Sequence, residues 1–258
     1  MEFKFKLKYF IISCMMLFII GFAIGMTIYS NNILNILPPG VKPSALDLIN
    51  EILNNNIFST FLLLLPIFLN EILERREIYL ESMIIRHRNF KDIFYREMKN
   101  LIIKNIVYLV ISVIFITLSI KLHGESFKLI NWNVKESFFS LQNNMTIDNI
   151  ELTTILFITG TLLLYFLTGF ITKLGYFYNR SFFPGFIYCF VIFVLDLVGR
   201  NYLKELIFPY VNTDRSIEFV LMAQIILVAL IIVAATFYSK VGKERFLFNT
   251  IKFKNTEN

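Results

Sequence analysis

The sequence predicts an all-α integral membrane protein with six transmembrane helices and both termini in the cytoplasm. The first reason is composition: 56% of the 258 residues are hydrophobic and 17% are charged, whereas soluble domains have about 45–50% apolar and about 25% charged residues. The second is distribution, because the apolar residues come in blocks close to the length of a bilayer crossing. The third is the uneven placement of basic residues between these blocks.

Six apolar segments are long enough, or nearly long enough, to cross a bilayer. A helix needs about 20 apolar residues for this, with a range of about 17–25. Lipid cannot satisfy exposed backbone N–H and C=O groups, so uncharged runs of this length are expected to be helical. Together they form a single transmembrane domain over residues 1–258, with spans at about 9–28, 57–73, 101–120, 152–172, 182–198 and 219–238.

The first span could be mistaken for a cleaved signal peptide, because a basic segment precedes it. Its apolar stretch of about 20 residues is longer than the about 7–15 of a signal peptide, and no A-x-A site follows, so we expect a retained anchor. The second span contains Pro66 and ends close to Glu71. The fifth is short, with Pro184 in its first turn, where proline is tolerated.

Lysine and arginine counts orient the spans. With the N-terminus inside, eighteen of the 25 basic residues fall on the cytoplasmic side and seven on the outer side. This bias follows the positive-inside rule and supports both the orientation and the number of spans. Topology therefore explains the net charge of +6, and nucleic acid is not expected as a partner.

The outer loops contain two notable features. From residue 45 on, apolar residues at helical spacing predict a short amphipathic helix lying on the outer surface. The loop at 121–151 holds the only tryptophan, Trp132, beside Phe138 and Phe139. Aromatic side chains collect at membrane interfaces, and we interpret these three residues as interfacial.

The inner loop at 70–100 predicts an amphipathic helical hairpin at the cytoplasmic surface. Its first half carries an apolar stripe with charges mostly off it, and the pattern breaks at residues 87–89. Asn89, with Asp92 three residues on, resembles a helix start, and the second stripe leads directly into the third span. Two interpretations stay open. The hairpin is either a connector held near anionic headgroups by its charges or a docking platform for a cytoplasmic partner.

Motifs for catalysis or metal binding are missing from the sequence. There is no GxxxxGK[ST], HExxH or GxSxG pattern. His87 and His123 lie in loops that the topology places on opposite sides of the membrane. Cys14 and Cys189 lie inside apolar blocks and are expected to be packing residues. We therefore expect no catalytic residue, cofactor or metal in this chain.

Ionisable residues in the spans are few. Asp196 lies near the outer end of the fifth span, four residues before Arg200, and we interpret them as a structural ion pair or as a polar site at the mouth of a pathway. Gln224 is expected to join helices, and Gly21 with Gly25 predicts close helix packing and a possible dimer face. We expect no buried carboxylate relay of the kind that proton-driven transporters need.

The inner loop resembles a known family. Residues 70–82 have the sequence NEILERREIYLES and are followed by Arg86, Arg88, Tyr95 and Lys99. This pattern is similar to the cytoplasmic loop of ABC-2-type permeases, the membrane subunits of ABC exporters. In that family the second span runs into a charged segment with a glutamate–arginine pair, followed by a coupling helix, a basic turn and an amphipathic helix. The matching positions here are Glu74, Arg75, Glu81, Arg86 and Lys99.

The resemblance implies a six-helix permease half that forms a homodimer or pairs with a similar permease. A separate ABC ATPase subunit would bind ATP and Mg²⁺ and dock on the loop, so this chain would be no enzyme. An amphipathic cargo such as a peptide, antibiotic or lipid and a bacterial cytoplasmic membrane are implied. The alternatives are a non-transporting polytopic protein (a scaffold or immunity factor) and an ion-coupled carrier. The implied docking residues are Glu74, Arg75, Arg76, Glu81, Arg86 and Arg88.

Overall fold

The computed structural model describes a helical chain. Among the described residues no strand occurs. The helices are α1 (Glu2–Ile28), the π-helical turn η1 (Tyr29–Leu34), α2 (Ala45–Asn54), α3 (Thr60–Leu73), α5 (Phe90–Lys121), α6 (Phe138–Asn143), α7 (Ile150–Asn179), α8 (Phe183–Leu197) and α10 (Ile217–Lys254). The described residues are 2–35, 41, 43–54, 60–73, 90–123, 131–132, 135, 137–143, 147, 149–179, 181–197, 206–209 and 216–254.

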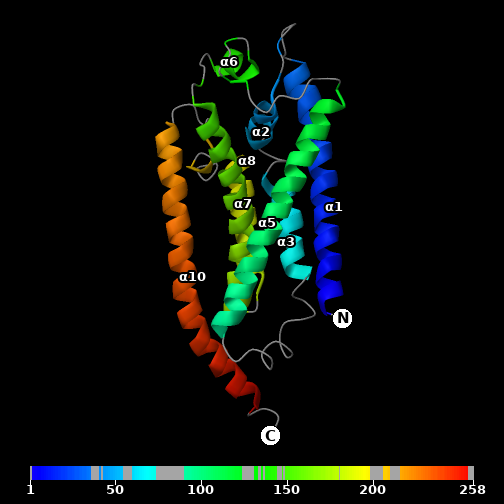
Figure 1. Ribbon diagram of the computed structural model, residues 1–258. Helices are drawn as coiled ribbons and strands as arrows, with labels where there is room; N and C mark the ends of the chain where they lie inside the picture. The colour runs from blue at the N-terminus through cyan, green and yellow to red at the C-terminus, as the bar shows by residue number, and fades with distance from the viewer. Residues whose placement is uncertain are drawn as a thin grey trace.

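Four of these helices have the length and apolarity needed to cross a membrane, as multi-pass membrane proteins do. They contain the apolar stretches Leu7–Asn31, Phe94–Lys121, Ile150–Gly175 and Ile217–Ser239, which agree with four of the six predicted spans. The helices at the other two predicted spans, α3 and α8, are shorter and also apolar. They run along the same bundle, and both chain termini lie at one end of it (Figure 1).

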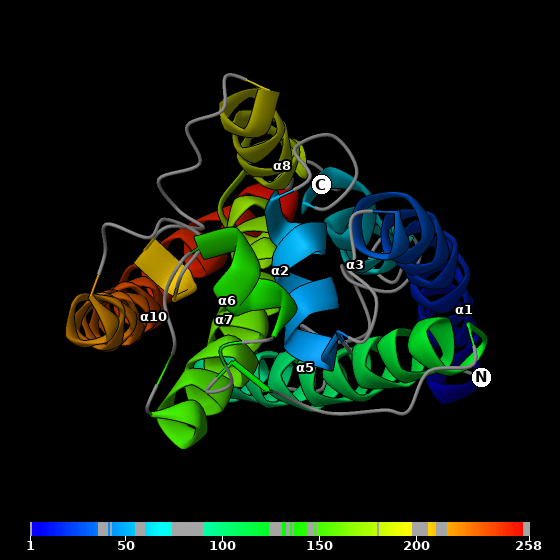
Figure 2. The same ribbon diagram turned by 90° about the horizontal axis from the view of Figure 1, so that it is seen from above.

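Helices α1, α3, α5 and α7 form a ring. In it, α1 packs on α3 and α5, and α7 packs on the same two helices. Over the described residues, the opposite pairs α1–α7 and α3–α5 make at most isolated contacts. Outside the ring, α8 packs on α3 and α7, and α10 packs on α5 and α7. Seen from above, α2 lies in the middle of this arrangement (Figure 2).

Two glycines bring α1 and α5 together. A Cβ on Gly21 would lie 2.5 Å from Phe115 Cε1, and a Cβ on Gly25 would lie 2.6 Å from Ser119 Oγ. The predicted close packing is therefore confirmed, and it occurs within one chain. The contact with α5 is sufficient to explain both glycines, and a dimer face at these positions stays a prediction.

The expectation that the helix after residue 45 lies on the outer surface is wrong. Leu46, Leu48 and Leu53 on α2 are buried, and so are its polar residues Asp47 and Asn50. The helical spacing correctly identified one apolar face. The remaining faces are covered as well, because α2 inserts among α1, η1 and α5.

The second half of the predicted hairpin is part of a longer helix. Helix α5 begins at Phe90 and continues without a break to Lys121, so this half leads into the third span as predicted. However, Phe94, Glu97 and Leu101 are buried within the bundle. Tyr95, Arg96 and Lys99 are exposed on the other face, so this half is amphipathic as predicted, and its location at the cytoplasmic surface stays a prediction. The first half, at 74–89, lies outside the described residues.

Candidate functional site

Lys173 on α7 is the centre of a buried ionic network. Its side chain has no exposed surface, and its Nζ donates to Glu97 Oε2 on α5 at 2.8 Å. The same Nζ lies 3.1 Å from Glu71 Oε2 on α3, close enough for an ion pair although the geometry is not that of a hydrogen bond. One ammonium group therefore joins α3, α5 and α7.

A second lysine completes the network. Lys104 Nζ, on α5, donates to Glu71 Oε1 at 3.2 Å, and Asn70 Nδ2 donates to the same oxygen at 3.4 Å. Two carboxylates thus face two ammonium groups. Charges this deeply buried are tolerated only when they are paired, and removing one partner typically costs about 3–5 kcal/mol. The network therefore fixes the relative positions of the three helices.

The end of α3 and the start of α5 lie at the end of the bundle that holds both termini (Figure 1). Glu71 is two residues before the end of α3, and Glu97 lies in the second turn of α5. The charged segment 74–89 connects these two helices in the chain. Both helices that flank the predicted docking loop are therefore tied to α7.

Hydroxyl groups join the ring helices farther along the bundle. Ser13 on α1 donates to the Pro66 carbonyl on α3 at 2.8 Å, and its Oγ lies 3.0 Å from the Tyr108 hydroxyl on α5. Ser112 on α5 lies 2.7 Å from the Tyr165 hydroxyl on α7. All four side chains are buried. The interior of the ring is thus polar at several levels.

Asp47 on α2 is the buried carboxylate of the opposite end. It accepts hydrogen bonds from the Ser44 backbone N–H at 2.6 Å, from Ser44 Oγ at 2.7 Å and from Trp132 Nε1 at 2.6 Å. Burial raises the pKa of Asp47 to about 6, while these three donors oppose the rise and the nearby charge of Glu51 adds to it. The carboxylate is therefore mostly ionised at pH 7.

Trp132 is fully buried, and Phe138 and Phe139 are buried as well, so the interpretation of these three residues as interfacial is wrong. Its ring stacks on Phe139 of α6 with centroids 4.1 Å apart, and it meets Phe157 of α7 edge-on at 5.7 Å. Its backbone carbonyl accepts a hydrogen bond from Ile147 N–H at 3.0 Å. The tryptophan is therefore a packed donor to Asp47, with Phe139 of α6 and Phe157 of α7 against its ring.

Most of the residues singled out from sequence as sites fall outside the described part of the chain. Arg200 lies outside it, and the side chain of Asp196 is not described, so their pairing stays a prediction. Gln224 joins helices as predicted. Its Nε2 donates to the Leu156 and Ile207 carbonyls at 2.9 and 2.6 Å, and its Oε1 accepts from Thr159 at 2.6 Å. The docking residues outside the description are Glu74, Arg75, Arg76, Glu81, Arg86 and Arg88.

Sequence reasoning missed the ionic network, because it considered only a carboxylate relay and did not single out Glu71 and Glu97 as buried residues. In the sequence, Lys173 directly follows the predicted span 152–172, like the basic residues that flank spans on the cytoplasmic side. For the Asp47 site, the sequence did contain a pattern that could have predicted the contact between Ser44 and Asp47. Ser44 followed three residues later by an acidic residue is the pattern of a helix N-cap box, and Asp47 N–H does donate to Ser44 Oγ at 3.4 Å.

Comparison of the chain with protein-family models, curated proteins and solved structures found no match. No group of three or more metal-binding side chains occurs among the described residues.

Proposed function

We propose that this chain is the permease subunit of an ATP-driven ABC exporter of the ABC-2 type. The observation that carries the proposal is the ionic network. It ties the end of α3 and the start of α5, the two helices joined by the charged segment 74–89, to α7 through Lys173. A partner that moves this segment would act on three helices at once.

The topology proposed with this function has six spans and both termini in the cytoplasm. The shared end of the two termini (Figure 1) and the excess of basic residues assigned to that side support it. In this orientation the segment 74–89 and the ionic network face the cell interior, where an ATPase would be. The membrane is then a bacterial cytoplasmic membrane.

ATP and Mg²⁺ belong to the partner in this proposal, and this chain carries no catalytic residue. The partner can shift the helices between two states only if it binds the two states with different free energies. The ionic network suits such a device, because separating its buried ion pairs would cost several kcal/mol and the three helices that it joins should therefore move together. A second permease copy or a similar chain completes the transporter, and the cargo is an amphipathic peptide, antibiotic or lipid.

The proposal is tested by co-expressing the chain with candidate ABC ATPases and measuring co-purification and membrane-dependent ATP hydrolysis. Charge reversal at Arg75, Arg86 and Arg88 should abolish partner binding and uncouple hydrolysis from transport. The matched control is Arg96→Glu, because Arg96 is an exposed arginine on α5 outside the segment. Loop variants that bind and transport like the parent would show that docking occurs elsewhere.

An ion-coupled carrier is the second candidate, because Glu71 and Glu97 are buried carboxylates that share one lysine. Such a pair could exchange protons during transport. Proteoliposomes containing this chain alone, with an imposed pH gradient, distinguish the two candidates. Gradient-driven cargo uptake without any ATPase would favour the carrier, and dependence on a co-purified ATPase would favour the exporter.

A further inference from the structure

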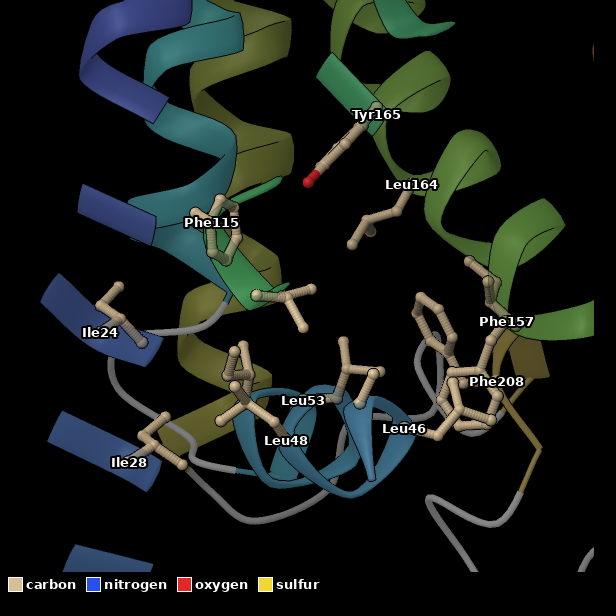
Figure 3. Close-up of a cluster of buried hydrophobic side chains, with 14 of the residues drawn as sticks. Ile24, Ile28, Leu46, Leu48, Leu53, Phe115, Phe157, Leu164, Tyr165 and Phe208 are labelled. Atoms are coloured by element: carbon tan, nitrogen blue, oxygen red, sulfur yellow. The ribbon is translucent and has the colours of Figure 1, made fainter. Parts of the chain in front are cut away.

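Helix α5 has one side inside the bundle and one side outside it. On the inner side, Phe115 and Ile24 of α1 point into the same buried cluster (Figure 3). On the outer side, exposed apolar residues recur every three or four positions and therefore form one stripe along the helix. On a helix long enough to cross a membrane, such a stripe is a surface for lipid chains. The stripe contains Ile102, Ile103, Ile106, Val110 and Val113.

Basic residues lie at both ends of this stripe. Lys99 precedes it by about one turn, Lys121 is the last residue of α5, and both side chains are exposed. The helix between them is about 33 Å long at about 1.5 Å per residue, which is close to the ~30 Å thickness of the hydrocarbon core of a bilayer. We therefore expect these two lysines to lie at the two headgroup layers.

The end of the stripe that lies with the chain termini carries a cluster of hydrogen-bond donors. Tyr95, Arg96 and Lys99 are exposed, and residues three or four positions apart are neighbours on one face of a helix. Their phenol, guanidinium and ammonium groups can all donate to phosphate oxygens. The two positive charges lie on adjacent turns, where like charges repel each other. This arrangement therefore favours the binding of an anion.

The carboxylates described at this end are already paired on the inner side of the bundle. Glu71 and Glu97 are buried and form ion pairs with the two lysines of the ionic network. Within the described residues, neither Arg96 nor Lys99 takes part in an ion pair. An anion that neutralises these two outer charges therefore comes from outside the described part of the chain.

We propose that Tyr95, Arg96 and Lys99 bind the headgroup of an anionic phospholipid. Its acyl chains lie along the apolar stripe that begins at Ile102. A lipid fits better than a free phosphate, because the donor cluster leads directly into a lipid-facing surface. Anionic lipids are also concentrated in the cytoplasmic leaflet, where the proposed topology places the cluster. The inference goes beyond the transport function, and it leaves the segment 74–89 to the proposed partner.

The test measures which lipid lies beside the stripe. Ile106→Cys, in a chain with Cys14→Ala and Cys189→Ala, is labelled with a bimane fluorophore, and the chain is placed in phosphatidylcholine nanodiscs. A small fraction of phosphatidylglycerol with a nitroxide on its acyl chain is included, and quenching of the fluorophore is measured. Nitroxide-labelled phosphatidylcholine at the same fraction gives the background. We expect phosphatidylglycerol to associate with residue 106 about tenfold more strongly, as charge-assisted hydrogen bonds allow.

Substitutions separate a lipid site from a diffuse attraction by positive charge. Arg96→Gln combined with Lys99→Gln should reduce the preference for phosphatidylglycerol by about tenfold. Exchanging the two residues for each other, as Arg96→Lys with Lys99→Arg, keeps both charges and should retain most of it. Tyr95→Phe removes a neutral donor and should reduce the preference by about threefold.

The matched controls are two exposed lysines outside the cluster. Lys8→Gln lies on α1 at the same end of the bundle, and Lys121→Gln lies at the other end of α5. Each should change the preference by less than about twofold at physiological salt, which screens exposed charges over about 8 Å. Unchanged emission of the buried Trp132 verifies that each variant is folded.

Equal quenching by the two lipids in the parent chain would overturn the proposal. An equal loss in Lys8→Gln would overturn it as well, because the attraction would then belong to the whole basic surface. Displacement of the labelled lipid by excess inorganic phosphate would assign the cluster to soluble anions. The assay contains no ATPase and no cargo, and Arg96→Glu is expected to leave ATPase co-purification intact. A failed lipid site is therefore distinguishable from a failed exporter proposal.

Discussion

The two ends of the bundle hold buried carboxylates in different ways. At the end with the termini, Glu71 and Glu97 face two lysines on α5 and α7. At the opposite end, Asp47 is held by neutral donors from Ser44 and Trp132. The first arrangement balances charge with charge across three helices. The second places one charge among dipoles and aromatic rings.

This difference indicates different mechanical properties. An ion pair in an apolar interior resists separation, because each separated charge would be left without compensation. A carboxylate held by neutral donors can lose one donor at a smaller cost, or can bind a proton and remain in place. We therefore expect the network to act as a rigid connection and the Asp47 site to be the one that responds to pH.

The largest effect is expected at Lys173. Lys173→Met removes the cation between Glu71 and Glu97 and leaves two buried carboxylates close together, so the free energy of unfolding should fall by about 3–5 kcal/mol. Unfolding of the detergent-solubilised protein by SDS titration measures this. The control Lys99→Met changes an exposed lysine of α5 and should alter stability by less than about 0.5 kcal/mol. A stable Lys173→Met variant would mean that the network is not a rigid connection.

The next effect concerns pH and Asp47. Its pKa of about 6 in the folded protein is above the value of about 3.9 in an unfolded chain. The folded state therefore binds the proton more tightly, and stability should fall as pH rises from about 4 to about 6, by about 3 kcal/mol at most, and then stay level. Unfolding midpoints measured across this range test the slope. Asp47→Asn should flatten it, and a slope that survives this substitution would assign the proton to another group.

The sequence was sufficient to predict the helices that long apolar runs form, because only a helix satisfies its own backbone in lipid. It did not predict the inward direction of Lys173. A lysine at the end of a span can extend to the headgroups or turn inward, and only the position of Glu71 and Glu97 on neighbouring helices decides this. The burial of α2 was missed for a similar reason, because helical spacing reports one apolar face and not what covers the others.

A double substitution separates the two ends quantitatively. Glu97→Gln in the Lys173→Met background neutralises the carboxylate to which Lys173 donates in the parent, while Glu71 keeps its ion pair with Lys104, so about 2 kcal/mol of the lost stability should return. Asp47→Asn combined with Lys173→Met should be additive within about 0.5 kcal/mol, because the sites lie at opposite ends of the bundle. Coupling between residues 47 and 173 larger than this would show that the two ends respond together.

The smallest effect is expected at Ser44, which caps α2. Ser44→Ala removes the hydroxyl that donates to Asp47 and accepts from its N–H, and it should lower the free energy of unfolding by about 1 kcal/mol. It also removes a hydrogen bond that favours the ionised carboxylate, so the pH-dependent region should move upward from about 6. Thr27→Ala, which removes an exposed hydroxyl of α1 bonded to the Ala23 carbonyl, should do neither. A downward movement of the pH-dependent region in Ser44→Ala would show that Ser44 does not stabilise the Asp47 charge.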